Sequence, residues 1–158
     1  MPSPTLLIGI GNAYRNDDGV GPVVIRELQA KGLPDTSCIE SDGDGATLID
    51  AWSTDSKVIL IDAVSSGAKP GTIHRFDALA QPIPASLSFL STHAFGVAEA
   101  LRLARALHRL PASLLVYGIE GKNFAVGADL SPEVEHAAHE VVEQIVKEFQ
   151  AALTSRKS

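Results

Sequence analysis

Two kinds of hydrophobic pattern follow one another along the chain. Short runs that are almost continuously apolar and rich in β-branched residues are typical of buried strands, whereas apolar residues three or four positions apart are typical of helices. Strands are predicted at 5–10, 36–40, 57–64, 72–76 and 113–119. Strands that alternate with helices favour a mostly parallel sheet covered by helices on both faces. The pattern therefore predicts an α/β fold.

Helices are predicted near 20–28, 48–52, 92–108 and from 132 to about 149. Thr92 can cap the third helix, and Ser131 followed by Pro132 marks the start of the last one. That last helix carries an apolar stripe that ends at Phe149. The final residues, "TSRKS", are predicted to lack structure.

The length of 158 residues fits a single domain, 1–158, ordered from about residue 5 to 152. With 19 acidic and 13 basic residues and no basic cluster, the chain does not look like a nucleic-acid-binding protein. Cys38 is the only cysteine, so no disulfide can form within the chain. The sequence shows neither a signal-peptide pattern nor an apolar run near the ~20 residues of a membrane span. We expect a cytoplasmic protein with no membrane or nucleic-acid partner.

The segment "LLIGIGNAYRNDDGVG" joins the first strand to the first helix. Its Gly9-x-Gly11 turn is typical of dinucleotide sites, but Tyr14 stands where the third small residue is needed. Asp17 and Asp18 would also compete with a phosphate for the positive end of the helix. A nucleotide site is therefore disfavoured. A helix cap explains one of the two aspartates, but not both.

Two further residues stand where ligands are usually bound. Asp62 ends an apolar run that reads as the central strand, and ligands of parallel sheets bind beyond such strand ends. His93 follows the predicted cap Thr92, where a helix dipole keeps an imidazole neutral and able to bind metal. Two carboxylates and one imidazole form a metal site with open positions. A turn-forming acid and a histidine bonded to the backbone are the alternatives.

Other side chains are assigned no chemistry. His136 and His139 are spaced for metal binding, but both lie off the apolar stripe of the last helix and are predicted to be solvated. Cys38 is predicted to be a small residue of the core. The sequence contains neither the G-x-S-x-G motif of serine hydrolases nor the H-E-x-x-H motif of zincins.

Four ordered blocks together resemble the hydrogenase maturation proteases, which trim the C-terminus of the large subunit of nickel-iron hydrogenases. The blocks are "GIGNAYRNDDGVG", "VILIDAVSSGAKPGTI", "STHAFGVAEALRLA" and "LPASLLVYGIEGKNFAVGADLSPEVEHA". The resemblance implies a three-layer α/β/α sandwich with a central, mainly parallel, five-stranded sheet. It also implies that Asp18, Asp62 and His93 bind nickel and, with Asp42, form the catalytic site.

The resemblance further implies an endopeptidase that acts on the large-subunit precursor after nickel insertion, the nickel being carried by the precursor. The chemistry stays open between an aspartic-type and a metal-assisted reaction. A nickel-dependent chaperone that does not cut the precursor is the alternative function. Family members often carry glutamate at the position of Asp18, so Asp17 can share its role. Asp44 competes with Asp42 as the supporting acid.

Overall fold

A computed structural model describes residues 4–84, 88–89 and 96–157, and its centre is a mainly parallel sheet. Five strands run in the order β2 (Thr36–Ser41), β1 (Thr5–Ile10), β3 (Lys57–Ser65), β6 (Ser113–Glu120) and β4 (Ile73–Asp77). Only β4 runs antiparallel within this order. The short β5 (Ser88–Phe89), which the sequence pattern did not predict, pairs antiparallel with the end of β3. The five predicted strands are confirmed.

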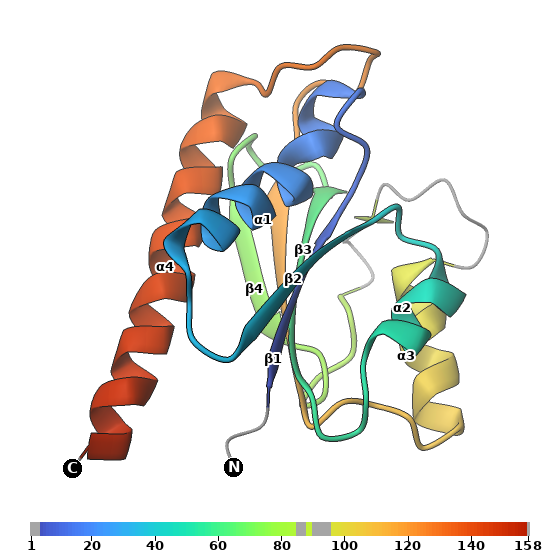
Figure 1. Ribbon diagram of the computed structural model, residues 1–158. Coiled ribbons are helices and arrows are strands. Elements are labelled where there is room, and N and C mark those ends of the chain that lie inside the picture. The colour runs from blue at the N-terminus through green and yellow to red at the C-terminus, as the bar shows by residue number, and fades with distance from the viewer. Residues whose placement is uncertain (1–3, 85–87, 90–95, 158) are drawn as a thin grey trace.

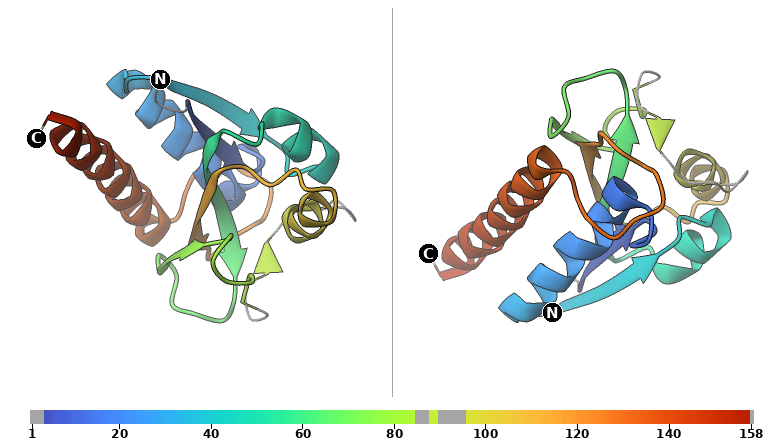
Figure 2. Two further views of the ribbon diagram at one scale, coloured as in Figure 1. Left: turned by 90° about the horizontal axis from the view of Figure 1, so that it is seen from below. Right: turned by 90° about the horizontal axis from the view of Figure 1, so that it is seen from above.

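Helices cover both faces of the sheet, as Figures 1 and 2 show. One face carries α1 (Val20–Lys31) and α4 (Pro132–Lys157), which contact each other. The other face carries α2 (Gly45–Ala51) and α3 (Val97–Ala106). A short 3-10 helix, η1 (Asn16–Gly19), leads into α1. The predicted three-layer α/β/α architecture is therefore confirmed.

The central strand β3 explains why the core lies on both sides of the sheet. Its residues from 58 to 64 are all buried, and successive side chains point to opposite faces. Leu60 and Val64 pack with the residues of α2 and α3, whereas Ile59 and Ile61 pack with those of α1 and α4. An apolar run without alternation is what a strand covered on both faces requires.

Two helix boundaries differ most from the sequence prediction. Helix α3 begins at Val97, after Gly96, whose amide donates to the Glu99 carboxylate at 3.1 Å. Helix α3 therefore begins later than predicted, and the predicted cap Thr92 lies outside the described residues. Helix α4 continues to Lys157, where an unstructured tail was predicted, because this segment contains neither glycine nor proline to end it.

The glycine-rich turn serves close packing between η1, α1 and the sheet. Gly11 has a φ of 146°, and a Cβ there would collide with the carbonyl oxygen of Asp18. A Cβ on Gly21 would likewise collide with the carbonyl oxygen of Ile10. Glycine at these positions lets η1 fold back across the end of β1.

Among the described residues, no helix combines the length and the apolar character needed to cross a bilayer.

Candidate active site

Three of the predicted acids follow neighbouring strands at one edge of the sheet. Asp62 lies near the end of β3, Asp18 follows β1 through η1, and Asp42 directly follows β2. The ends of β1 and β2 are joined by a hydrogen bond from the Gly11 amide to the Ser41 carbonyl at 2.9 Å. Because these strands are parallel, their carboxyl ends meet, and this edge is where ligands of such sheets bind.

Asp62 is a buried carboxylate, and the described residues donate a hydrogen bond to only one of its two oxygen atoms. Its side chain is 1% exposed, and Oδ1 accepts one bond from the amide of Ala63 at 2.8 Å. Oδ2 has no hydrogen-bond partner among the described residues. Burial, and then the negative charge of Asp18, raise the pKa of Asp62 well above its usual value. An ionised Asp62 is therefore unfavourable unless a proton or a cation joins it.

Asp18 is the neighbour that interacts electrostatically with Asp62. Its side chain is buried, and Oδ2 accepts a hydrogen bond from the Asn12 amide at 3.1 Å. Burial raises the pKa of Asp18, and the Asn12 amide and the charge of Arg15 offset this only in part. When two buried carboxyl groups interact and both have raised pKa values, a state with one of them protonated is favoured over two full charges. Such a pair can act in acid–base chemistry or bind a cation.

The adjacent Asp17 has a different environment and a structural task. Its carboxylate accepts four hydrogen bonds, from the amides of Lys122 at 2.8 Å, Asn123 at 2.8 Å and Ser131 at 2.7 Å, and from the Ser131 hydroxyl at 2.8 Å. Burial raises the pKa of Asp17, but the hydrogen bonds from Ser131, Asn123 and Lys122 outweigh it and lower the pKa overall. Asp17 thus fastens the loop between β6 and α4 to η1.

Of the two neighbouring aspartates, Asp18 is the one that interacts with Asp62, because both oxygens of Asp17 are already bonded. Neither carboxylate caps α1: Gly19 occupies the N-cap position and no side chain bonds there. The interpretation of one aspartate as a helix cap is therefore wrong.

The two candidate supporting acids also divide their roles. Asp44 is the N-cap of α2 and accepts hydrogen bonds from the amide and the hydroxyl of Thr47 at 3.3 and 2.8 Å. The Asp42 side chain is exposed, and its Oδ1 accepts a bond from the Asp44 amide at 3.0 Å. A helix cap accounts for Asp44, and Asp42 stays the predicted supporting acid.

His93 lies outside the described residues, so its part in the site stays a prediction. Within the described part of the chain, no three His, Cys, Asp or Glu side chains gather as a metal site would require. The remaining histidines of α4 are solvated, as predicted: His136 pairs with Glu140 at 2.9 Å and His139 with Glu27 at 3.3 Å. Cys38 is partly buried against the core, as predicted.

A buried carboxylate at the end of β6 was not predicted. Glu120 is 2% exposed and accepts hydrogen bonds from the Ser66 amide at 2.8 Å, the Ser66 hydroxyl at 2.6 Å and the His74 ring at 3.2 Å. Burial raises the pKa of Glu120, but Ser66 and His74 outweigh it and lower the pKa overall. Glu120 is the last residue of the apolar strand β6, as Asp62 lies near the end of β3, and this sequence signal could have identified it.

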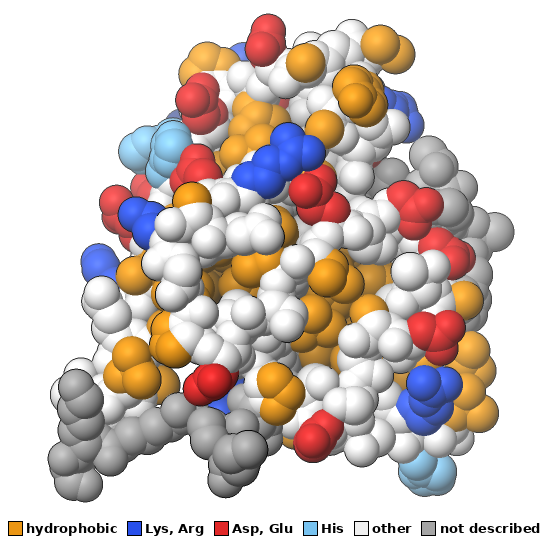
Figure 3. All heavy atoms as spheres, in the orientation of Figure 1, with side chains coloured by type: hydrophobic (Ala, Val, Ile, Leu, Met, Phe, Trp, Pro, Cys, Tyr) orange, Lys and Arg blue, Asp and Glu red, His pale blue; other side chains and the backbone are white. Residues whose placement is uncertain are grey.

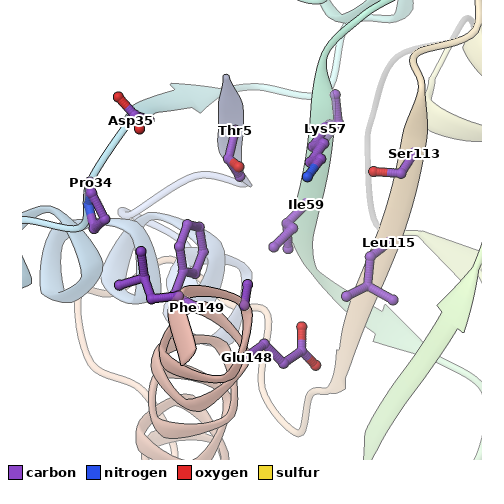
Figure 4. Close-up of a pocket in the computed structure, with 12 residues that line it drawn as sticks. Thr5, Pro34, Asp35, Lys57, Ile59, Ser113, Leu115, Glu148 and Phe149 are labelled. Atoms are coloured by element: carbon purple, nitrogen blue, oxygen red, sulfur yellow. The ribbon is translucent and has the colours of Figure 1, made fainter. Parts of the chain in front are cut away.

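An apolar cavity of about 210 Å³ lies at the opposite end of the strands (Figure 4). Thr5, Lys57 and Ser113, the first residues of their strands, line it together with Phe149 of α4. Glu148 at its edge already binds Arg75 at 2.8 Å. Because the acids lie at the carboxyl ends of the same strands, this cavity is not part of the candidate active site.

Comparison with known proteins gives one consistent family. A model of the family described as hydrogenase maturation protease matches residues 22–148. The chain is 32% identical over 152 residues to the putative hydrogenase maturation protease of Methanocaldococcus jannaschii, covering 91% of this chain and 95% of that protein. It is 26% identical to the hydrogenase 2 maturation protease of Escherichia coli, covering 89% and 87%. The solved [NiFe] hydrogenase maturation protease HybD from Thermococcus kodakarensis superposes with a TM-score of 0.74 at 27% identity, covering 91% and 97%.

Proposed function

The chain belongs to the hydrogenase maturation protease family and is a peptidase, and on this premise we propose its substrate and its site. The substrate is the large-subunit precursor of a nickel-iron hydrogenase, from which the enzyme removes the C-terminal extension once nickel has been inserted. Asp18, Asp62 and His93 bind the nickel of the precursor, and Asp42 supports them.

One observation carries the proposal: the buried Asp62 carboxylate beside Asp18, with Oδ2 lacking a partner among the described residues. The described residues do not supply the hydrogen bonds that would compensate for burying this acid, and such a group destabilises the fold. A pair of carboxylates in which Asp62 Oδ2 accepts no hydrogen bond from the described residues is a suitable partner for a divalent cation. The donor set, two carboxylates and one imidazole, therefore fits nickel that arrives with a substrate.

The pair also explains how the enzyme could distinguish a loaded precursor from an empty one. Three ligands, two of them carboxylates, bind nickel weakly, so donors of the precursor are needed to complete the coordination. Carboxylates must lose their protons to bind metal, so the raised pKa of Asp62 weakens the binding of free cations further. When bound, nickel supplies positive charge next to the carboxylates. Specificity then depends on an interaction that an empty precursor cannot make.

Nickel-loaded and metal-free precursor are expected to differ sharply as substrates. Under identical conditions the wild-type enzyme should release the C-terminal peptide from the loaded form and leave the empty form intact, because only the loaded form carries the nickel that the enzyme's ligands bind. Mass spectrometry of both reactions over time measures this. Equal rates would refute the metal check, and a loaded precursor that binds without being cut would instead favour the chaperone function.

A further inference from the structure

Two hydrophobic side chains stand out at the surface of the described residues. Val126 is 89% exposed and Tyr14 is 76% exposed, whereas the other exposed large hydrophobic residues reach 52% at most. Val126 lies in the loop between β6 and α4, and Tyr14 lies in the turn between β1 and η1. We refer to Tyr14 and Val126 together as the apolar ridge.

Hydrogen bonds hold the two segments of the apolar ridge together. The Gly127 amide donates to the Tyr14 carbonyl at 2.9 Å, and the Asn16 amide donates to the Gly127 carbonyl at 2.8 Å. The Asn16 side chain adds a bond to the Ala125 carbonyl at 3.0 Å. Asp17 fastens both ends of the same loop through Lys122 and Ser131. The exposed side chains therefore project from a well-supported backbone.

Part of the apolar ridge belongs to the same segment as Asp18. Tyr14 precedes Asp18 by four residues, and the Asn12 amide that bonds Asp18 lies in the same turn. Seen from above, the loop between β6 and α4 passes around η1 and the start of α1 (Figure 2, right). Hydrophobic side chains gather over this loop at the top of Figure 3.

We propose that the apolar ridge is a specificity determinant that docks an apolar segment of the precursor beside the cleavage site. This inference rests on the proposed function. We take the substrate as the occupant because Tyr14 and Asp18 belong to one short segment, which hydrogen bonds hold to the loop that carries Val126. Exposed tyrosines are frequent hot spots of interfaces, and a rigid support reduces the ordering cost of binding.

Kinetics of the variants Tyr14→Ser, Val126→Ser and the double variant on nickel-loaded precursor test the proposal. The double variant is expected to raise KM about tenfold and to change kcat less than about twofold, since docking acts before the chemical step. Leu107→Ser, which removes another exposed hydrophobic side chain at the end of α3, is the matched control and should change neither constant. A melting temperature within about 2 °C of wild type shows that the variants fold.

Measurements of binding affinity distinguish an error in the docking proposal from an error in the proposed function. Titration calorimetry of metal-free precursor, which is not cut, into wild-type enzyme and into the double variant should show about tenfold weaker binding without the ridge side chains. If the double variant has the KM and the affinity of the wild type, the docking role of the ridge is refuted. Cleavage of the loaded precursor by the wild type would still support the proposed function in that case. An enzyme that neither binds nor cleaves any loaded hydrogenase precursor would overturn both. A wild-type dimer that the double variant dissociates, at unchanged KM, would assign the ridge to a second copy and also overturn the proposal.

Discussion

Replacement of Asp62 by asparagine is expected to abolish cleavage and, at the same time, to stabilise the free enzyme. Cleavage is lost because the amide can neither carry the negative charge nor exchange the proton that the site needs. The free energy of unfolding should rise by about 1 to 3 kcal/mol at neutral pH, because the variant removes a buried acid whose Oδ2 has no hydrogen-bond partner in the described part of the chain. Gain of stability with loss of activity is the signature of a residue kept for function.

The pH dependence of this effect follows from the raised pKa of Asp62, which burial and then Asp18 produce. A carboxyl group whose pKa is higher in the folded state than in the unfolded chain favours folding when it is protonated. This contribution is full below the unfolded pKa of about 4 and is lost as the pH rises through the folded pKa. The stability advantage of Asp62→Asn over wild type should therefore grow from about pH 4 towards neutral pH.

Urea unfolding of wild type and variant over this pH range measures the difference. Asp50→Asn is the matched control, because Asp50 is an exposed acid whose side chain is 3.8 Å from Arg109. It should change the free energy of unfolding by less than about 0.5 kcal/mol and leave cleavage intact. An Asp62→Asn enzyme that is less stable than wild type at neutral pH would contradict this account of the site.

Replacement of the neighbouring Asp17 by asparagine is expected to have the opposite effect on stability. The carboxylate accepts four hydrogen bonds, and the amide would turn an NH2 group towards some of the same donors. Loss of the charge and of these bonds should lower the free energy of unfolding by about 2 to 4 kcal/mol at neutral pH. The loop between β6 and α4 should also exchange its amide hydrogens faster.

For Asp17 the sign of the pH dependence is reversed, since the hydrogen bonds outweigh burial and lower its pKa. Its contribution is full above the unfolded pKa of about 4 and is lost as the pH falls through the folded pKa. The difference between wild type and Asp17→Asn should therefore shrink in acid. A double-mutant cycle with Ser131→Ala isolates the bond to the hydroxyl. A loss of less than about 0.5 kcal/mol for Asp17→Asn would refute the anchoring role.

The strands were predictable because their signal is local. β3 is buried from residue 58 to 64, and its continuous apolar run predicted a strand covered on both faces. The start of α3 was not predictable from a cap residue alone, because Thr92 has a suitable side chain whereas the actual N-cap is Gly96. The tail of α4 was misjudged because polar residues at the end of a chain were taken as a sign of disorder.

The functions of adjacent acids could not be separated by sequence. Asp17 and Asp18 share a 3-10 turn in which successive side chains point in different directions. The partners of Asp17 lie 105 to 114 residues further along the chain, so no local pattern reveals them. Asp62, in contrast, was identified because an acid at the end of a buried strand is unusual wherever that strand lies.

We propose that this chain removes the C-terminal extension of a nickel-loaded hydrogenase large subunit by means of its buried carboxylate pair. Intact-mass measurement of the loaded precursor after incubation with wild-type or Asp62→Asn enzyme tests it most directly. We predict that the wild type releases a single C-terminal peptide and that Asp62→Asn releases none while remaining folded. Absence of the peptide with the wild type, or its release at the same rate by Asp62→Asn, would contradict the claim.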